Sequence, residues 1–280
     1  MSHPNIGFLG AGHMNRAILS AILTDEQTNI TPDCLSATCQ TPEHAQAVGK
    51  QFNIRAHCDN AALVHDSDVI ILGVKPQQMH DVLTQLSQYN LEDKLIITLA
   101  AGIELEDYRK ILGDALIVRA MPNIASEKQA GLTALYSDID LLEEDEALIE
   151  SIFNSAGSII WLDDEIQLDG IIALSGSGLA FMFRFMQSMA QAGEQFGFEA
   201  DELFDILSVT AMGAATLALE SEDPSPSFKH FCDKIAVAGG TTAEGIKIME
   251  SHDIDTLVRN TFTATIEKNR ALKDDLTKDW

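Results

Sequence analysis

Short apolar runs alternate with segments of helical periodicity through the first half of this 280-residue chain, and this alternation most constrains its fold. Parallel strands joined by crossover helices give this pattern, because a strand buried on both faces reads as a continuous apolar run. We expect strands, in order, at Ile6–Leu9, Leu35–Thr38, Val69–Val74, Leu95–Leu99 and Ile117–Arg119. The pattern predicts an α/β fold whose N-terminal part is a Rossmann-type, doubly wound parallel sheet.

Amphipathic helices are expected between these strands. Arg16–Leu23 and Met79–Leu86 each place their apolar residues on one helical face. Weaker strands are expected at Thr133–Tyr136 and Ile159–Trp161, on either side of an acidic helix, Glu143–Ala156. The acidic start of that helix suits the positive end of a helix dipole.

The strand signal disappears after about residue 163, and helical patterns continue from there. We therefore expect a dinucleotide-binding domain at residues 1–163 and an all-α domain for dimerisation and substrate binding at residues 164–280. The helices expected in the second domain are Gln167–Phe196, Ala200–Leu219, Ser227–Ala236, Thr242–His252 and Ile254–Leu276.

One segment of the helical half is apolar on nearly every side. Leu179–Met186 reads Leu-Ala-Phe-Met-Phe-Arg-Phe-Met, so the helix that contains it must be buried on several sides. A domain of this size can bury it alone, but a second subunit buries it more easily. The segment therefore favours a homodimer formed through the C-terminal helices.

The net charge of −25 excludes nucleic acids and anionic membranes as partners, because both are polyanions. If the ligands are anionic, long-range attraction cannot bring them in. Helix N-termini and glycine-rich turns must then capture them locally.

The four cysteines form no Cys-x-x-Cys pair, and free thiols are typical of a reducing compartment. The first strand begins at Ile6, which leaves no room for a signal peptide. No uninterrupted apolar run reaches the roughly 20 residues that span a bilayer. We therefore expect a cytoplasmic protein without a membrane partner.

The first strand is followed by Gly10-x-Gly12-x-x-Asn15, a dinucleotide fingerprint without its third glycine. Gly10 permits the tight turn, and Gly12 lets the backbone approach a pyrophosphate at the positive end of the next helix. An ordinary strand-to-helix turn would also explain the pattern. The position between a strand and an amphipathic helix favours a nicotinamide cofactor.

The end of the second strand bears on the choice of cofactor. Thr38-Cys-Gln-Thr41-Pro contains no Asp or Glu for a ribose 2′-hydroxyl, which favours NADPH and leaves NADH open. No arginine stands there, and the nearest in sequence is Arg55. Thr38, Thr41 and backbone amides would hold the 2′-phosphate, unless the threonines only shape the turn.

Three other strand ends carry small or turn-forming residues. Val74-Lys75-Pro76 follows the third expected strand, where ligands of doubly wound sheets bind, although Lys75 would also suit a solvated rim. Ala100-Ala101-Gly102 and Met121-Pro122-Asn123 follow the next two strands. Their shapes leave room beside a flat ring, as any tight turn also would.

Two glycine-rich segments stand out in the helical half. Ser175-Gly-Ser-Gly178 begins a long helix, which suggests close helix packing or a ligand. Gly239-Gly-Thr-Thr242 opens another helix and offers amides and two hydroxyls to a small anion. The eight histidines have no ligand spacing, so we expect no metal. Together the segments indicate a reductase acting on a small carboxylate.

Over essentially its whole length the chain resembles the pyrroline-5-carboxylate reductase family. The matching segments are Gly7–Met14, Val74–Pro76, Arg119–Asn123, Ala173–Gly178 and Gly239–Thr242. The last two are specific, since other Rossmann dehydrogenases do not carry them in that order.

The resemblance implies hydride transfer from NADPH, or less often NADH, to the C=N bond of 1-pyrroline-5-carboxylate. This oxidoreductase reaction gives L-proline and is the last step of proline biosynthesis. The family needs no metal. It forms intertwined homodimers through the C-terminal helices, with the substrate loop contributed across the dimer, and often larger rings such as decamers.

The resemblance also implies site residues. Backbone amides of Gly239, Gly240, Thr241 and Thr242 hold the substrate carboxylate, the Thr242 hydroxyl bonds the ring nitrogen as the catalytic contact, and Ser175 joins the substrate site. With Thr38 and Val74 from the strand ends, the expected cofactor residues are Leu9, Gly10, Ala11, Gly12, His13, Met14, Thr38, Thr41, Asn60, Val74, Lys75, Pro76, Ala100, Ala101 and Gly102.

The chain departs from the family pattern in two places. Val237-Ala238 replaces the usual Ser-Pro before Gly-Gly-Thr-Thr, which loosens the loop and removes a hydroxyl. Leu179-Ala-Phe181 replaces the usual Pro-Ala-Tyr. These departures bear on substrate affinity more than on the fold.

Three alternatives stay open. A 3-hydroxyacid dehydrogenase-like enzyme would need a lysine on the long helix, yet the charged residues between Ser175 and Gly197 are Arg184 and Glu194. A reductase of another cyclic imine is the second, since one methylene changes binding by only about 1–3 kcal/mol. A sensor that binds NADP without turnover is the third.

Overall fold

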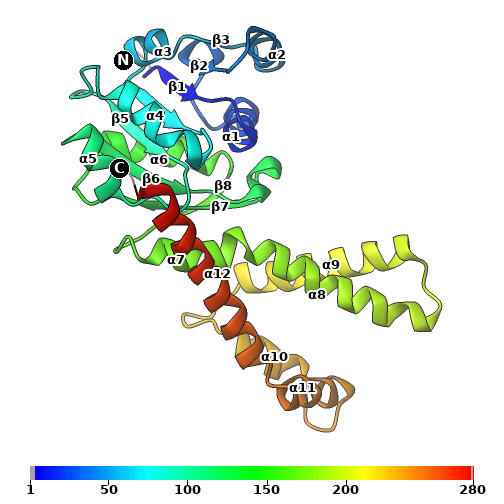
Figure 1. The fold of residues 1–280 in the computed structure, drawn as a ribbon. Helices are drawn as coiled ribbons and strands as arrows, with labels where there is room; N and C mark the ends of the chain where they lie inside the picture. The colour runs from blue at the N-terminus through cyan, green and yellow to red at the C-terminus, as the bar shows by residue number, and fades with distance from the viewer. Residues whose placement is uncertain (1–3, 279) are drawn as a thin grey trace. The chain divides into compact units, whose positions relative to one another are not determined.

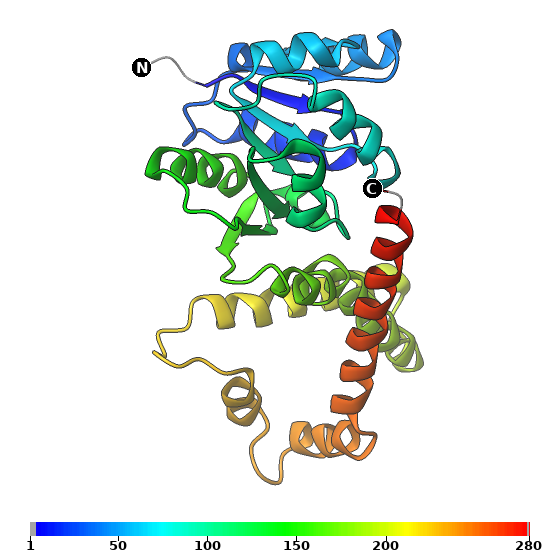
Figure 2. The ribbon, with the colours of Figure 1, turned by 60° about the vertical axis from the view of Figure 1, so that its left-hand side comes forward.

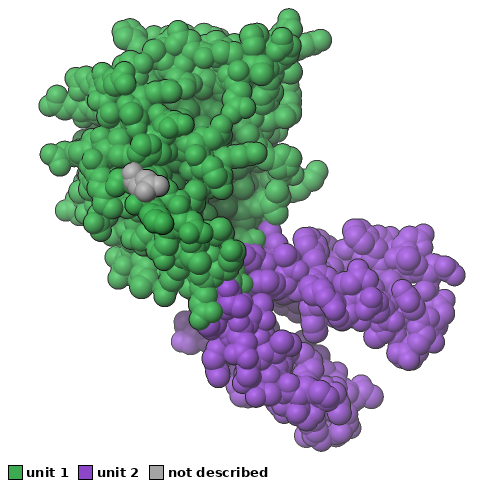
Figure 3. All heavy atoms as spheres, in the orientation of Figure 1, with its two compact units in different colours: residues 1–176, 265–280 green, residues 177–264 purple. Residues whose placement is uncertain are grey.

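The structure, a computed structural model, describes residues 4–278 and 280 and divides into two compact units. Unit 1 comprises Met1–Gly176 together with Thr265–Trp280, and unit 2 comprises Ser177–Ala264 (Figure 3). The chain thus leaves unit 1 after Gly176 and returns to it at Thr265. This division follows compactness, whereas the boundary predicted at residue 163 follows composition and stays a prediction.

Unit 1 contains an eight-stranded sheet in the order β3-β2-β1-β4-β5-β6-β7-β8 (Figure 1). Neighbouring strands are parallel, except that β6 and β7 are antiparallel. The strands are β1 (Ile6–Leu9), β2 (Leu35–Thr38), β3 (Arg55–His57), β4 (Val69–Leu72), β5 (Leu95–Thr98), β6 (Leu116–Met121), β7 (Gly131–Tyr136) and β8 (Gly157–Trp161). The predicted doubly wound sheet is confirmed.

Helices cover both faces of this sheet (Figure 2). One face packs against α1 (His13–Thr24), α2 (Pro42–Phe52) and α6 (Glu143–Asn154), and the other against α3 (Asn60–Asp66), α4 (Pro76–Leu86) and α5 (Leu105–Leu112). Successive residues of a strand point to opposite faces. Ile71 accordingly belongs to the first layer and Ile70 to the second, and both are fully buried.

The sequence interpretation missed β3. Its residues are Arg-Ala-His, and they are exposed or half-buried. The strand lies at the edge of the sheet and pairs only with β2 in the order observed. An edge strand buries less side-chain surface, so its sequence need not contain an apolar run.

The helix predicted over Gln167–Phe196 is not one regular α-helix. It consists of α7 (Gln167–Ile171), a π-helical segment η3 (Ile172–Gly176), α8 (Gly178–Gly193) and a 3₁₀ turn η4 (Glu194–Phe196). The π-helical segment ends with Ser175 and Gly176, the first two residues of the Ser-Gly-Ser-Gly motif. Such segments occur frequently at functional sites.

Unit 2 is helical and has little core of its own. Besides α8 it contains α9 (Ala200–Leu219), α10 (Phe228–Ile235), α11 (Thr241–Ser251) and the first part of α12 (Ile254–Thr277). Among its described residues, Leu203 is the one buried hydrophobic side chain. Large side chains such as Phe183 and Met212 are mostly exposed.

Two helical stretches are long and apolar enough to cross a membrane, contrary to our expectation. They are Gln167–Phe196 and Ala200–Leu219, and 28% and 6% of their most apolar windows are buried. Length and composition alone are weak grounds for a membrane protein, because helices of soluble proteins meet the same criterion.

Candidate functional site

A cavity of about 280 Å³ lies beside the carboxyl ends of the first four strands. The strand order reverses at β1, between β2 and β4, and doubly wound sheets bind ligands outside such a switch point. The lining residues are Leu9, Gly10, Thr38, Cys39, Gln40, Cys58, Asn60, Val74, Gln78, Asp81, Val82 and Gln85. Five predicted cofactor residues, Leu9, Gly10, Thr38, Asn60 and Val74, are therefore brought together here.

The turn after β1 brings the backbone to the uncapped start of a helix, where an anion can approach it closely. Gly10 has φ +87°, and a Cβ there would lie 2.9 Å from Cγ1 of Val74. Gly12 is the N-cap of α1, and in the described chain no side chain caps this helix or places a carboxylate in its first turn. The amides of His13 and Met14 therefore open a helix whose positive end suits an anion.

The two predicted threonine ligands already have backbone partners. The Thr38 hydroxyl accepts a hydrogen bond from the Gly10 amide at 3.3 Å and is almost fully buried. The Thr41 hydroxyl caps α2 by accepting from the His44 amide at 3.3 Å. Asn60 begins α3, and its side-chain amide donates to Gln85 at 3.4 Å. Thr38 thus supports the turn after β1, and phosphate binding by Thr38 or Thr41 stays a prediction.

A cation near this cavity comes from α1 and is not among the predicted cofactor residues. The Arg16 guanidinium donates to the Gln51 side chain at 2.6 Å. Burial raises the pKa of the Cys39 thiol, Cys58 adds to this rise, and Arg16 opposes it. Arg16 therefore lies within electrostatic reach of the end of β2. Its place one turn after Gly12 was the available signal.

The other predicted cofactor residues lie at neighbouring strand ends. Lys75 is exposed and is the N-cap of α4, and Pro76 is the first residue of that helix. Ala100 is buried, Ala101 is half-buried, and Gly102 has φ +73°. These five residues do not line the 280 Å³ cavity among the described residues.

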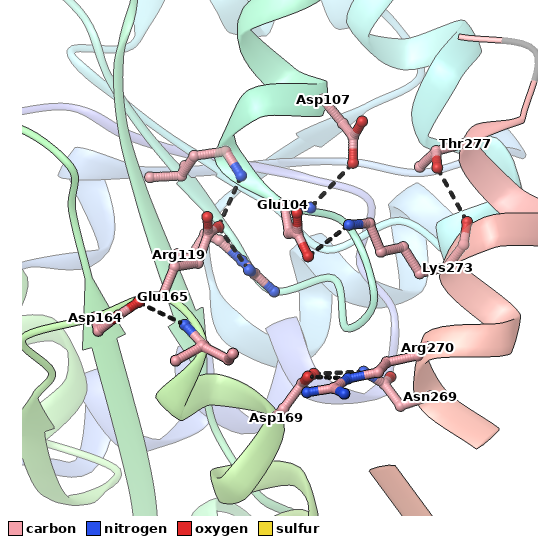
Figure 4. A network of polar contacts seen from close by, with 12 residues as sticks. Glu104, Asp107, Arg119, Asp164, Glu165, Asp169, Asn269, Arg270, Lys273 and Thr277 are labelled. Carbon is pink, nitrogen blue, oxygen red and sulfur yellow. Dashed lines mark hydrogen bonds and ion pairs between the residues drawn. The ribbon is translucent and has the colours of Figure 1, made fainter. Parts of the chain in front are cut away.

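Gly102 instead lines a second, highly charged cavity of about 540 Å³ within unit 1. Arg119 on β6 pairs with Glu165 at 2.7 Å, and Lys273 on α12 pairs with Glu104 at 2.5 Å (Figure 4). The Arg270 guanidinium donates to Asp169 at 2.8 Å.

These pairs join the last turns of α12 to the elements around β6 (Figure 4). Each of the cavity's three cationic side chains thus has a carboxylate partner. We therefore assign the network a structural role.

Two motifs that are far apart in sequence meet at the end of β6. The Asn123 side-chain amide donates to the Ser175 hydroxyl at 2.8 Å, and both residues are buried. Asn123 also accepts from the Ala125 amide at 3.0 Å. Because β6 is parallel to β5 and β4, its carboxyl end opens on the same edge of the sheet as the Gly10 turn. Ser175 therefore lies at the edge of the sheet where doubly wound folds bind ligands.

The Gly-Gly-Thr-Thr loop lies in unit 2, at the start of α11. The Gly240 amide donates to the Val237 carbonyl at 3.0 Å, and Gly239 has φ +77°. A bond from the first to the fourth residue with positive φ at the third is the pattern of a type II turn. Thr241 and Thr242 follow it and are exposed.

The amides open to a ligand are those of the first turn of α11. The first amides of a helix have no carbonyl partner within it, and no described side chain caps this one. Thr241, Thr242 and Ala243 therefore offer N–H groups. The Gly240 amide, which we predicted to bind the substrate, is occupied by Val237 in this structure.

Family comparisons match both parts of the chain. The family described as "Pyrroline-5-carboxylate reductase dimerisation" matches residues 165–272, and "NADP oxidoreductase coenzyme F420-dependent" matches residues 5–102. A pyrroline-5-carboxylate reductase of Vibrio alginolyticus is 30% identical over 96% of this chain and 97% of its own length.

Solved structures agree with this comparison. A pyrroline-5-carboxylate reductase from Coxiella burnetii matches with a TM-score of 0.88 and 32% identity, over 97% of this chain and 99% of its own. A Plasmodium falciparum pyrroline carboxylate reductase, solved with NADP bound, matches with a TM-score of 0.83 and 26% identity, over 98% of this chain and 99% of its own.

Proposed function

The chain belongs to the pyrroline-5-carboxylate reductase family, and we propose that it reduces 1-pyrroline-5-carboxylate to L-proline with NADPH. The observation that carries this proposal is that the likeness extends over both units. The sheet supplies a dinucleotide site, and α11 supplies an uncapped helix start for a small carboxylate. The reaction is the last step of proline biosynthesis.

On the cofactor side, we infer that the pyrophosphate binds at Gly10–Met14 and the adenosine end in the 280 Å³ cavity. The backbone opening at Gly10 and Gly12 and the uncapped α1 fit this group. The absence of an acid after β2 and the nearness of Arg16 favour a 2′-phosphate, so NADPH is preferred over NADH. When bound, the cofactor supplies the hydride.

On the substrate side, the carboxylate binds the first amides of α11, and the Thr242 hydroxyl bonds the ring nitrogen. Local amide dipoles do this without a lysine, which matters in a chain of net charge −25. Hydride addition to a protonated imine removes positive charge, so the site needs alignment of the reactants more than a strong acid. Ser175 is proposed to border the substrate at the edge of unit 1.

The assembly proposed is a homodimer through the C-terminal helices, with a larger ring such as a decamer as a further step. The exposed apolar side chains of α8 and α9 support a partner subunit. We retain residues 1–163 and 164–280 as the proposed functional domains. The small-molecule chemistry and the free thiols support a cytoplasmic location.

The first experiment is NADPH oxidation by the purified protein with pyrroline-5-carboxylate, repeated with NADH and with the six-membered cyclic imine. Fast turnover of the five-membered ring is expected. A preference for the six-membered ring would assign another imine reductase. Tight NADPH binding without turnover of either imine would favour a sensor.

Thr242→Ala tests the proposed catalytic contact. We expect kcat/KM for the imine to fall by at least about tenfold, which corresponds to about 1.4 kcal/mol. Ser251→Ala is the matched control, because its hydroxyl bonds the Ile248 carbonyl at the other end of α11. A loss below tenfold would remove Thr242 from the active site.

A further inference from the structure

The third glycine of the dinucleotide fingerprint is replaced by Asn15, and Asn15 is fully buried. That glycine normally lets the first helix pack closely on the strands. Here the side chain of Asn15 occupies the space and donates a hydrogen bond of 2.6 Å from Nδ2 to the Gly10 carbonyl. The substitution therefore reaches the turn that approaches the cofactor.

The room for Asn15 comes from Gly73, which directly follows β4. A Cβ on Gly73 would lie 2.1 Å from Nδ2, 2.2 Å from Cγ and 2.4 Å from Oδ1 of Asn15. The Gly73 amide is also bonded to the Leu9 carbonyl at 3.1 Å, so its backbone cannot move away freely. Gly73, at the end of the neighbouring strand β4, thus leaves the space that a glycine at position 15 would otherwise leave.

Burial of Asn15 lowers the free energy of unfolding. Its Oδ1 has no hydrogen-bond partner among the described residues. A buried, unpaired acceptor costs about 1–3 kcal/mol, which is no less than one hydrogen bond contributes. An apolar side chain of the same shape would fill the space without that cost, so stability alone does not explain an asparagine here.

The hydrogen bond fixes the direction of one peptide group. In a planar trans peptide the carbonyl of Gly10 and the N–H of Ala11 point in opposite directions. Asn15 holds this carbonyl on its own buried side. Burial raises the pKa of the Cys39 thiol, and a hydrogen bond from the Ala11 N–H lowers it in part, so this amide points to Cys39. Cys39 lines the 280 Å³ cavity, whereas Ala11 is buried beside it, so a ligand in the cavity would accept from this amide in place of the thiol.

We propose that Asn15, seated on Gly73, is a positioning residue that aims the Ala11 amide at the dinucleotide. The proposal rests on the proposed function for the identity of the ligand. The Thr38 hydroxyl accepts from the Gly10 N–H, and the Asn15 side-chain amide donates to the Gly10 carbonyl. Both backbone polar groups of Gly10 are therefore hydrogen-bonded, which fixes the turn.

Asn15→Leu tests the proposal, because leucine has a similar shape and lacks the amide. NADPH binding, measured by fluorescence titration without imine, is expected to weaken about threefold to tenfold, the range that one hydrogen bond supplies. KM for NADPH should rise with it, while kcat and KM for the imine stay within about twofold. The melting temperature should hold or rise, because the unpaired oxygen is gone.

Unchanged NADPH affinity in Asn15→Leu would overturn the proposal. A fall in kcat and melting temperature together with a rise in both KM values would also overturn it, since that pattern marks a structural role only.

A double-mutant cycle tests the seat on Gly73. Gly73→Ala should weaken NADPH binding and lower the melting temperature, because the added Cβ overlaps Asn15. Asn15→Gly combined with Gly73→Ala removes the overlap, so the double variant should bind NADPH more tightly than Gly73→Ala alone. Strictly additive changes in the free energy of NADPH binding would show that Gly73 does not make the room for Asn15. Gly170→Ala is the control, since a Cβ there meets no described atom within 4 Å.

The binding titration separates this inference from the proposed reaction. A wild-type protein that binds NADPH but reduces no pyrroline-5-carboxylate would contradict the proposed reaction. The NADPH affinities of wild type and Asn15→Leu could still be compared. A wild-type protein that binds neither NADPH nor NADH would overturn both.

Discussion

Unit 1 and unit 2 bury their apolar side chains in different ways. Unit 1 has two closed layers of buried residues, one on each face of the sheet. In unit 2, Leu203 is the one described hydrophobic residue that is buried in the single chain. The difference shows that unit 1 carries its own core, whereas the core of unit 2 must be shared with another subunit.

The composition of the helices explains the difference. Met79, Val82 and Leu83 lie on one side of α4 and are buried against strands of the same unit. On α8 and α9, by contrast, large side chains such as Phe185 and Phe204 stay exposed. The family region that covers these helices is the dimerisation region. The sequence of unit 2 therefore specifies an interface where unit 1 specifies an interior.

Phe183→Glu should separate the two subunits if the helices of unit 2 share a core. Phe183 is 64% exposed in the single chain, and a charge at a dimer core costs about 3 kcal/mol or more. We expect monomers by light scattering and loss of imine turnover. Leu142→Glu in unit 1, also 64% exposed, is the matched control and should change neither. A Phe183→Glu dimer with full activity would contradict the shared core.

Arg119→Met is the corresponding test of the interior of unit 1. The Arg119 side chain is 7% exposed, and removal of one partner of a buried ion pair costs about 3–5 kcal/mol. Denaturant unfolding of unit 1 should show this loss. Arg119→Met with Glu165→Gln should recover much of it, because no unpaired charge remains. A cost below about 1 kcal/mol would mean that water reaches the pair.

Alkaline pH should also weaken unit 1. Burial raises the pKa of the Tyr108 phenol far above its ordinary value, against an opposing hydrogen bond from Thr98. The folded state therefore keeps the proton above pH 10 while the unfolded chain loses it. Stability is fully present below about pH 10 and falls above it by about 1.4 kcal/mol per pH unit.

Tyr108→Phe should remove this alkaline slope at a cost of about 1 kcal/mol at neutral pH, from the lost hydrogen bond. Unfolding curves from pH 8 to 11 measure both effects. An unchanged slope in Tyr108→Phe would assign the pH dependence to other groups.

Ala238→Pro should rigidify the turn before α11 in unit 2. Position 238 is the second residue of the turn closed by Val237 and Gly240, where type II turns favour proline. A proline that fits stabilises by about 0.4–1 kcal/mol. Hydrogen exchange of the Gly240 amide should slow, and Ala238→Gly should accelerate it. Faster exchange in Ala238→Pro would mean that the turn adopts another conformation.

Sequence patterns predicted most of the sheet. Ile6–Leu9 and Leu35–Thr38 are strands with the predicted bounds, because each is apolar and buried on both faces. β3 escaped because an edge strand needs no apolar run. The bounds of the helical region Gln167–Phe196 were predicted correctly. Its π-helical turn was not predicted, because the periodicity of a few residues does not separate π from α geometry.

The turns at the glycine-rich motifs were predictable, because glycine itself permits their backbone conformation. Gly10 and Gly239 adopt the positive φ angles that their motifs require. The contacts of Asn15 with Gly73 and of Asn123 with Ser175 join residues that lie 52 or more positions apart, and no local pattern encodes them. The bond of the Gly240 amide to Val237 was not foreseen, because it depends on how the loop closes, and substrate binding by this amide stays a prediction.

The return of the chain to unit 1 at Thr265 has a consequence for protein synthesis. Unit 1 cannot be completed until Arg270 and Lys273 have left the ribosome, because their carboxylate partners lie on segments made long before. The apolar helices of unit 2 are made in the interval. A nascent chain of this protein therefore exposes both an unfinished first unit and an unshared interface. The last turns of α12 end the first exposure, and a second subunit must end the other.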